Sequence, residues 1–323
     1  MGRIRIGVMG CAAIARKSVI PAIKQLADEF TLVAVASRTK EKAEALAAEF
    51  GCNAVVGYDA LLSAEIDAVY IPLPTGLHDE WINKALAAGK HVYAEKSIAN
   101  SAPGAHEMVK SARKNDLALM EGYMFQYHPQ HQAVKNLISE GAIGAIRSFR
   151  GSFGFPPLDS SNFRYDNEVG GGALYDAAGY PLRALHFLLG SHFRVQGASL
   201  FNDPVSGTNI FGSAYLKDDS GVGAHLDFGF DHFYQCNYEI WGSKGKLTAL
   251  RAYTPAAEFA PTLLLEQQGK SETITIAPDN HFIGAMAEFH RLVSGTGDRH
   301  SHYDAILLQS DSLEAIKNFA AKA

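Results

Sequence analysis

Residues 3–15, RIRIGVMGCAAIA, constrain the fold of this chain more than any other segment. An alternating and then unbroken apolar run ends there in a turn of very small residues, which predicts a buried strand that feeds a helix. Gly7 and Gly10 have no Cβ, and the alanines that follow carry only a methyl group. The backbone N–H groups at the start of the helix can therefore approach an anionic group closely, as a pyrophosphate cradle requires.

The turn is a variant of the dinucleotide-binding fingerprint Gly-x-Gly-x-x-Gly. In the best overlay the three positions are Gly10, Ala12 and Ala15, so alanine replaces two of the three glycines. The alternative is the first strand–helix turn of any α/β domain, and the rest of the chain has to decide between the two. The residues predicted to line the cradle are Gly10, Cys11, Ala12, Ala13 and Ile14.

Size, charge and cysteine content exclude several classes of protein. A chain of 323 residues, 47% of them apolar, is long enough for two domains with separate cores. The net charge of -5, without a basic stripe, argues against a nucleic-acid partner. The cysteines Cys11, Cys52 and Cys236 are odd in number and show no CxxC spacing, which favours a reducing compartment and no metal. Without an apolar signal segment or a run of ~20 apolar residues, we predict a cytoplasmic protein with no membrane partner.

The segment after the second predicted strand, TLVAVAS, indicates which cofactor is bound. We predict a helix over residues 13–30 before this strand. A carboxylate roughly 20 residues past the glycines would hold the ribose 2′-hydroxyl of NAD. Here Ser37, Arg38 and Lys42 follow instead, and cations with a hydroxyl suit a 2′-phosphate. The sequence therefore favours NADP and leaves NAD possible. The alternative is that Arg38 and Lys42 are solvated residues at the start of a helix.

Strands and helices continue to alternate through the first half. Helices are predicted over 40–50 and 58–63, and strands near residue 53 and over 67–73, which indicates a doubly wound parallel sheet. Such sheets bind ligands at the carboxyl ends of their strands. Leu73 and Pro74 lie in the loop at one such end, so we expect them beside the nucleotide. His78 opens the next helix and is either a ligand contact or a capping and core histidine.

The strand KHVYA ends in Glu95 and Lys96, at another carboxyl end of the predicted sheet. A lysine at this place can donate to a substrate oxygen and lower the pKa of a neighbouring proton donor. The alternative is a surface ion pair.

The second half of the chain has a different residue pattern from the first. A strand over 117–123 and a helix over 130–140 place a domain boundary near residue 122, which gives domains 1–122 and 123–323. Beyond it, runs rich in aromatic and β-branched residues predict a mostly antiparallel sheet, as part of an α+β domain. These runs are IRSFRGSFGF, FRVQGASLF, TNIFGSAYL, VGAHLDFGF, QCNYEIWG and KLTALRAY. A final helix over 303–321 is expected to pack back on this sheet or on the first domain.

A helical segment over residues 170–190, GGGALYDAAGYPLRALHFLLG, carries a second set of chemical groups. Asp176 and Tyr180 are four residues apart, so they share one face of a continuous helix. Pro181 is expected to kink that helix and present the Tyr180 hydroxyl to a cleft. A carboxylate and a phenol opposite the strand-end lysine form a proton-transfer set. The alternative is a core tyrosine with a satisfied hydroxyl.

Together these segments resemble the Gfo/Idh/MocA family (glucose-fructose oxidoreductase, inositol dehydrogenase and rhizopine catabolism proteins). The motifs that carry the resemblance are GVMGCAAIA, DAVYIPLP, LHDEWINKALAAGKHVYAEKS, LMEGYMFQYHPQ and GGGALYDAAGYP. The resemblance implies a Rossmann domain, followed by a domain with an open-faced sheet that covers the nicotinamide end and forms homodimers or homotetramers. One departure is Ser97, where the family has a proline after the lysine that is cis in many members.

Many members of this family carry Asp-x-x-x-His where this chain has Asp176 and Tyr180. The chain is thus similar to the lysine–tyrosine branch, which includes nucleotide-linked ketosugar 3-reductases, NADP-dependent xylose dehydrogenases and dihydrodiol dehydrogenases. The resemblance implies that Tyr180 is the acid or base, that Lys96 biases it toward ionisation, and that Asp176 orients the substrate or the lysine. Phe163 and Arg164 match a family position near the nicotinamide and pyrophosphate. The residues implied at the substrate are Tyr123, Phe125, His128, Asp176 and Tyr180.

The resulting prediction is an oxidoreductase that moves a hydride between C4 of NADP(H) and a carbonyl or carbinol carbon of a sugar-like ring. Lys96 and Tyr180 are expected to converge beside the cofactor. Reduction of a nucleotide-linked ketosugar is favoured, and oxidation of an aldose such as xylose or of a dihydrodiol is the alternative. A second alternative is a regulatory protein that senses dinucleotides, and the presence of both Lys96 and Tyr180 argues against it.

Overall fold

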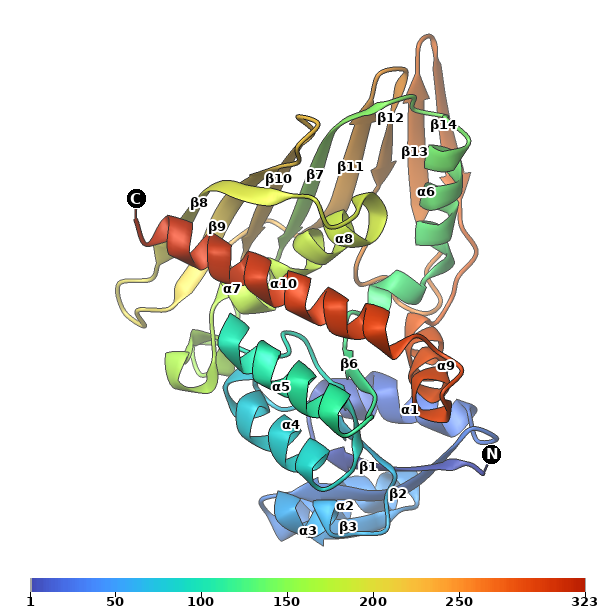
Figure 1. The fold of residues 1–323 in the computed structure, drawn as a ribbon, viewed down its shortest axis with the longest axis vertical. Helices are drawn as coiled ribbons and strands as arrows, with labels where there is room; N and C mark the ends of the chain where they lie inside the picture. The colour runs from blue at the N-terminus through green and yellow to red at the C-terminus, as the bar shows by residue number, and fades with distance from the viewer. Residues whose placement is uncertain (1, 323) are drawn as a thin grey trace. The chain divides into compact units, whose positions relative to one another are not determined.

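A computed structural model describes residues 2–322 of the chain. These residues form two compact units, and Figure 1 shows their helices and strands coloured from blue at the N-terminus to red at the C-terminus. Unit 1 contains the chain up to Gly122 together with Phe282–Ser310, and unit 2 contains Tyr123–His281 together with the segment from Asp311.

Unit 1 is built on a parallel sheet of six strands in the order β3-β2-β1-β4-β5-β6. The strands are β1 Ile4–Met9, β2 Phe30–Ser37, β3 Asn53–Val56, β4 Ala68–Ile71, β5 His91–Ala94 and β6 Leu119–Glu121. Each neighbouring pair is parallel, because a helical crossover separates consecutive strands. This confirms the predicted doubly wound sheet, whose carboxyl ends carry the loops after β1, β2, β4 and β5.

The helices of unit 1 follow the predicted order with one correction. They are the π-helix Ala15–Val19, α1 Ile20–Gln25, α2 Lys40–Phe50, α3 Tyr58–Leu62, the 3-10 helix Thr75–Leu77, α4 His78–Ala87, α5 Ala102–Lys114, and α9 His281–Ser294 with the start of α10 Arg299–Ala320. The prediction of one helix over 13–30 was wrong, because Leu26 leaves the helical region and Phe30 already belongs to β2. Phe30 pairs with Ile4 and is 3% exposed, so sheet pairing and burial outweigh its helical spacing. Helices α5 and α9 were not predicted.

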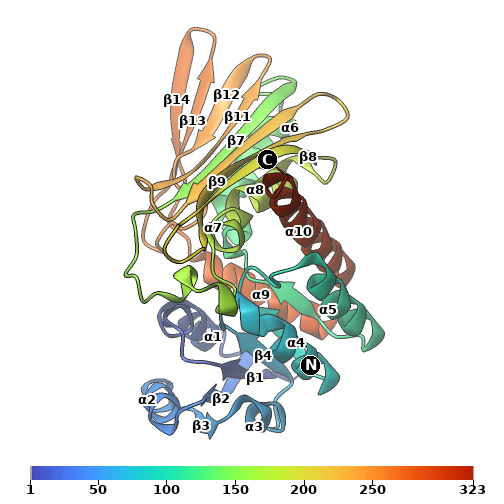
Figure 2. The same ribbon diagram turned by 90° about the vertical axis from the view of Figure 1, so that its left-hand side faces the viewer.

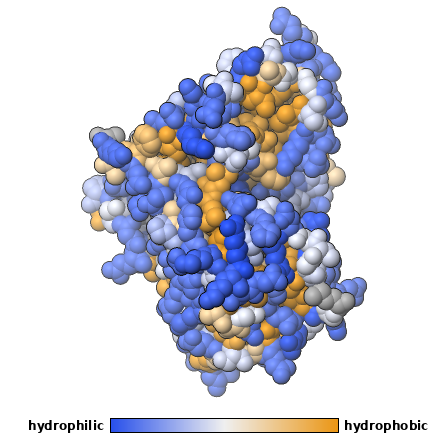
Figure 3. All heavy atoms as spheres, viewed as in Figure 1, coloured by the Kyte–Doolittle hydropathy of each residue, from blue (hydrophilic) through white to orange (hydrophobic). Residues whose placement is uncertain are grey.

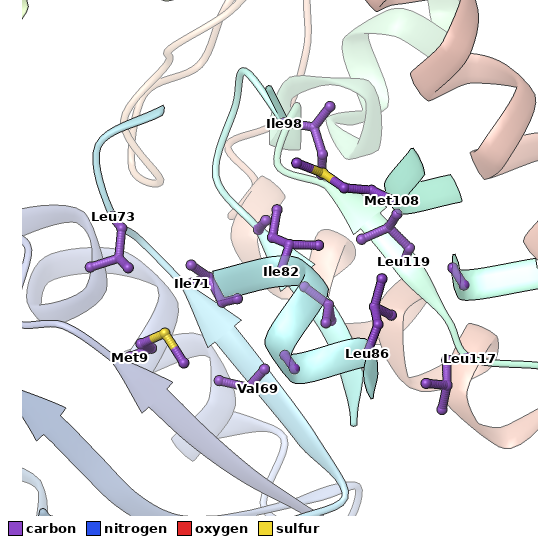
Figure 4. Close-up of a cluster of buried hydrophobic side chains, with 14 of the residues drawn as sticks. Met9, Val69, Ile71, Leu73, Ile82, Leu86, Ile98, Met108, Leu117 and Leu119 are labelled. Atoms are coloured by element: carbon purple, nitrogen blue, oxygen red, sulfur yellow. The ribbon is translucent and has the colours of Figure 1, made fainter. Parts of the chain in front are cut away.

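The core of unit 1 lies between the sheet and helices α4 and α5. Figure 4 shows Val69 and Ile71 of β4 beside Ile82 and Leu86 of α4, with Met108 of α5 and Leu119 of β6 in the same cluster. Tyr303 and Ile306 of α10 also belong to this cluster. Burial of these apolar surfaces holds the strands in place, so the loops at their carboxyl ends start from fixed positions.

Unit 2 contains an eight-stranded sheet in the order β14-β13-β12-β11-β7-β10-β9-β8. Its strands are β7 Ile146–Gly154, β8 Arg194–Asn202, β9 Asn209–Lys217, β10 Gly223–Gly229, β11 Gln235–Gly242, β12 Gly245–Ala249, β13 Thr262–Gln267 and β14 Lys270–Thr275. Only the β7–β10 pair is parallel among these described strands, which confirms the mostly antiparallel prediction. Strands β13 and β14 were not predicted. Helices α6 Pro129–Ser139, α7 Ala173–Asp176 and α8 Gly179–Leu189 lie on one face of the sheet, as Figure 2 shows.

The predicted continuous helix over 170–190 is two helices in the structure. Helix α7 ends at Asp176, and α8 begins at Gly179. Pro181 therefore lies in the first turn of α8, where a missing N–H leaves no intrahelical bond unmade. The expectation that Pro181 kinks a continuous helix was wrong for this reason. Gly179 is required at the start of α8, because a Cβ there would overlap the Tyr123 hydroxyl.

The surface differs between regions of the chain. Figure 3 shows hydrophilic side chains over α4 and α5, and apolar side chains over β12 and β13. Among the described residues, no helix has both the length and the apolar character needed to span a membrane.

Candidate active site

The turn after β1 has the geometry of a cradle for an anion. Gly10 has a φ of +114°, and a Cβ there would lie 3.0 Å from the Leu73 side chain, so glycine is required. Cys11, Ala12, Ala13 and Ile14 follow it and lead into the π-helix. Ala15, at the last fingerprint position, is fully buried. A methyl group is thus accommodated in the core, which explains how the fold keeps this turn without the third glycine.

Two cations follow β2, beside this turn. Ser37 is buried, and its hydroxyl accepts a hydrogen bond from the Thr39 N–H at 3.3 Å. Arg38 and Lys42 are exposed, and neither forms an ion pair with a carboxylate within the described part of the chain. The Lys42 carbonyl accepts a bond from the Cys11 thiol at 3.5 Å, which places the start of α2 against the cradle. The arrangement leaves two cations available for a phosphate near the Gly10 turn.

His78 connects the loops that follow β4 and β5. It is fully buried, with Nε2 2.9 Å from the Leu73 carbonyl oxygen and Nδ1 2.9 Å from that of Ser97. Burial lowers the pKa of His78, against the opposing effect of these carbonyls. Whichever nitrogen carries the hydrogen in the neutral ring has an acceptor beside it. The geometry thus favours the core alternative, in which His78 holds two loops rather than a ligand.

The segment that carries Lys96 is fixed by two acidic side chains. The Tyr70 hydroxyl donates to Glu95 Oε1 at 2.7 Å, and the Ile98 N–H donates to Glu121 Oε1 at 2.8 Å. The peptide bond between Lys96 and Ser97 is cis. Sequence reasoning missed Glu121, which is only 3% exposed. An acidic residue at the end of the apolar run LALM was the available signal.

Tyr180, in the first turn of α8, lies among aromatic rings. Its ring centroid is 4.6 Å from that of Phe153, and 5.7 Å from those of Tyr123 and Tyr253. Phe125 is 6.1 Å away, so the structure brings together the predicted residues Tyr123, Phe125 and Tyr180. Tyr180 is 6% exposed, and the rings around it exclude water from its sides. Such an enclosure holds a phenol in one orientation.

Asp176 and Arg164 meet in unit 2. The Arg164 Nε donates to Asp176 Oδ2 at 2.7 Å, and the two side chains are 27% and 16% exposed. Burial acts to lower the pKa of Arg164, but the charges of Asp176 and Tyr180 raise it overall. Phe163 stacks against the same guanidinium at 4.8 Å. The predicted cofactor residues Phe163 and Arg164 therefore form one cluster with the predicted catalytic residue Asp176.

His128 caps the N-terminus of helix α6. It is 1% exposed, and its Nδ1 accepts a hydrogen bond from the Gln130 N–H at 3.2 Å as a helix cap. Its ring lies 6.2 Å from that of His281. The predicted contact of His128 with substrate stays a prediction.

Comparison with known proteins identifies the family. Residues 4–123 match the model of the oxidoreductase family with an NAD-binding Rossmann fold, GFO/IDH/MocA. Residues 131–248 match the C-terminal domain of the same family. This chain belongs to the GFO/IDH/MocA oxidoreductase family. The resemblance found in the motifs is confirmed, and with it the prediction of an oxidoreductase.

Several relatives in this family have assigned activities. A dTDP-3,4-didehydro-2,6-dideoxy-alpha-D-glucose 3-reductase from Saccharopolyspora spinosa is 44% identical over 91% of this chain and 89% of its own length. A D-xylose 1-dehydrogenase (NADP(+)) from Haloferax volcanii is 32% identical over 90% of this chain and 89% of its own. The crystal structure of a 3-ketoreductase from Actinomadura kijaniata, in complex with NADP and TDP-benzene, has a TM-score of 0.95 at 39% identity and covers 98% of both chains.

Proposed function

We propose that this GFO/IDH/MocA protein is an NADPH-dependent reductase of the keto group of a nucleotide-linked sugar. The observation that carries the proposal is the buried Tyr180 in its enclosure of rings, on a fold shared with a 3-ketoreductase that binds NADP and TDP-benzene. Relatives with 44% and 42% identity reduce a dTDP-linked sugar at C3, whereas the xylose dehydrogenase relative has 32%.

The cofactor site follows from the chain's own residues. The Gly10 turn would hold the pyrophosphate, and Arg38 with Lys42 would hold the 2′-phosphate of NADPH, because both cations are exposed and lack carboxylate partners among residues 2–322. When bound, NADPH supplies the hydride for the carbonyl carbon.

The proton comes from the protein. Tyr180 would donate its hydroxyl proton to the ketone oxygen, and Lys96 would stabilise the phenolate that remains. Arg164 holds Asp176 in place at 2.7 Å, so Asp176 can orient the substrate or Lys96. Crystal structures of the 3-ketoreductase from A. kijaniata include a variant with a tyrosine changed to phenylalanine and one with a lysine changed to alanine, the same two residue types.

NADPH oxidation at 340 nm tests this proposal. We expect turnover with a dTDP-linked 3-ketosugar and at least tenfold lower kcat/KM with the corresponding free sugar, because binding of a remote nucleotide contributes to the transition state. Oxidation of xylose or a dihydrodiol with NADP, without reduction of any nucleotide-linked ketosugar, would favour the alternative dehydrogenase.

We also propose that the protein self-associates through the sheet face without helices. Trp241 is 54% exposed, and Phe201 stacks on Phe211 with centroids 4.7 Å apart. The side chains of Trp241 and Phe201 point away from the buried face of the sheet. Successive side chains of a strand alternate between its two faces, and their neighbours Ile240 and Leu200 are the more buried ones. Sedimentation velocity would show a dimer or larger species, and Trp241→Lys would shift it toward monomer. A monomer at micromolar concentration in the unchanged protein contradicts this.

A further inference from the structure

An arginine without a carboxylate partner lies at the same end of the unit 2 sheet as Tyr180. Arg251 follows the end of β12, and Tyr234 precedes the start of β11, which pairs with it. The guanidinium carbon lies 4.7 Å from the ring centroid of Tyr234 and 5.6 Å from that of Phe259. Within the described chain Arg251 forms no ion pair, whereas Arg164 of the same unit is paired with Asp176.

The main chain of Arg251 is held by the segment His128–His131, which follows the boundary between the units. The Gln130 side chain is fully buried, and its Nε2 donates to the carbonyls of Arg251 at 3.1 Å and Ala252 at 3.3 Å. His131 Nε2 lies 2.9 Å from the same Ala252 carbonyl. The base of the arginine is therefore fixed, and only its side chain reaches outward.

This cluster is connected to Tyr180 through one residue. The ring centroid of Tyr253 lies 5.7 Å from that of Tyr180, with the ring planes tilted by 35°, and Tyr253 is two positions from Arg251. The Tyr234 hydroxyl lies 3.1 Å from the Thr254 hydroxyl, on the other side of Tyr253 in the sequence. Tyr253 therefore joins the ring cluster around Tyr180 to the segment that carries Arg251, at the end of the sheet where β7 ends and β11 begins.

The surroundings of Arg251 suit one class of ligand. A guanidinium that stacks on aromatic faces keeps its edge N–H groups for bidentate bonds to phosphate oxygens. Phe259, which lies beside the guanidinium, is 43% exposed, so flat apolar surface is available next to the cation. Bases stack on such rings without strict sequence preference. A nucleoside diphosphate presents both an anion and a flat base.

We propose that Arg251, Tyr234 and Phe259 form the subsite for the nucleoside diphosphate part of the substrate, with the phosphates on Arg251 and the base against the exposed ring of Phe259. The inference rests on the proposed function for the nucleotide-linked nature of the substrate. This subsite would account for an arginine that forms no ion pair within the described chain and for the partly exposed ring of Phe259 beside it.

Thymidine diphosphate binding tests the subsite. Calorimetric titration is carried out on the full chain saturated with NADP, so that the cofactor's own pyrophosphate cannot occupy Arg251. Arg251→Met keeps an apolar stem on the rings and removes the charge, and should weaken TDP binding about 10- to 100-fold. Arg251→Lys keeps the charge without the planar fork and should fall between Arg251→Met and the unchanged protein. The matched control is Arg147→Met, an exposed arginine of β7 at the other end of the sheet, which should leave TDP binding unchanged.

The role of the ring is tested separately. Phe259→Ala should weaken binding of TDP and leave binding of inorganic pyrophosphate unchanged, since only TDP has a base. Equal losses for both ligands would contradict the base-stacking part. Unchanged NADP affinity in each variant shows that the protein is folded.

The outcomes separate this inference from the proposed function. If the unchanged protein reduces a dTDP-linked ketosugar and Arg251→Met and Arg251→Lys both bind TDP as tightly as it does, the subsite is wrong and the proposed function stands. A change of oligomeric mass in Arg251→Met without a change in TDP affinity would assign Arg251 to self-association instead. If the unchanged protein does not bind TDP but reduces free sugars, both the subsite and the nucleotide-linked substrate are wrong.

Discussion

The Arg164 guanidinium binds the Asp176 carboxylate, with Nε 2.7 Å from Oδ2, and this ion pair ties the loop before the glycine run to the last residue of α7. Asp176 is therefore held from outside its own helix. The pair also places a cation in the electrostatic range of Tyr180, because the charge of Tyr180 contributes to the raised pKa of Arg164.

Removal of Asp176 should destabilise the protein more than removal of both partners. Asp176→Ala leaves a largely buried guanidinium unpaired and should lower the free energy of unfolding by about 1–2 kcal/mol, a value reduced for partial exposure. The double variant Arg164→Met, Asp176→Ala should recover part of this loss. Urea unfolding measures both, and strictly additive losses would show that the pair contributes no coupling.

Tyr180→Phe should remove the proton donor and keep the enclosure of rings. We expect kcat to fall by about 10²- to 10⁴-fold, with NADPH affinity unchanged, because general acid catalysis contributes on this order. Tyr215→Phe, at a partly exposed tyrosine of β9, is the control and should retain full activity. Turnover near that of the unchanged protein would exclude Tyr180 as the acid.

Arg38→Ala should change cofactor preference. The dissociation constant of NADPH is expected to rise about 10- to 100-fold and that of NADH by less than about threefold, since only NADPH has the 2′-phosphate. Fluorescence titration measures both. Lys110→Ala is the control, because the Lys110 ammonium is paired with Glu107 at 3.2 Å on α5. An equal loss for both cofactors would contradict the assignment of Arg38.

His78→Phe should leave the carbonyls of Leu73 and Ser97 without their imidazole. We expect a loss of about 1–3 kcal/mol in the free energy of unfolding, the cost of an unsatisfied buried acceptor. His78→Gln keeps one amide donor and should lose less. If thermal unfolding of both variants matched the unchanged protein, while NADPH binding failed, His78 would be a ligand contact after all.

Stability should fall as the pH drops below about 6.5. Burial is the main cause that lowers the pKa of His131 and His281 to about 3 and that of His91 to about 4. As the pH falls, these histidines therefore bind protons in the unfolded chain before they do so in the folded protein. Between pH 6.5 and about 4, each of them lowers the free energy of unfolding by about 1.4 kcal/mol per pH unit. Urea unfolding from pH 7.5 to 4.5 checks this, and His131→Gln should make the slope shallower. An unchanged slope would mean that His131 is already protonated in the folded state.

Local periodicity was sufficient for most elements and failed at particular places. The six strands of the Rossmann sheet and several of its helices could be predicted, because their apolar residues form the short runs or the helical spacing typical of such elements. Helices α5 and α9 were not predicted. The helix predicted up to Phe30 was too long, since pairing of Phe30 with Ile4 depends on a strand remote in the sequence. Strand β14, KSETIT, was not predicted because it is mostly exposed and has no apolar alternation. Strand β13, which pairs with it, was missed as well.

For the candidate site too, some features could be predicted from the sequence and others could not. The residue types at Gly10, Lys96 and Tyr180 could be recognised from motifs, because each motif lies within one short segment. The sequence could not show that His78 is enclosed by the carbonyls of Leu73 and Ser97, nor that Glu121 binds the Ile98 N–H. These contacts join loops that follow different strands, and parallel pairing of those strands decides them.

The sequence by itself determined the family, the parallel sheet, and the residue types that are proposed here for proton transfer and phosphate binding. These properties depend on residue type and spacing over a few turns of chain, which local sterics and apolar burial translate directly into structure. Only the tertiary structure decided that Arg164 holds Asp176, that four rings surround Tyr180, and that the Arg251 guanidinium lies against the rings of Tyr234 and Phe259. The partner of a charged or aromatic side chain is the group that the fold brings within a few ångströms of it. The number of residues between the two in the sequence does not predict that distance.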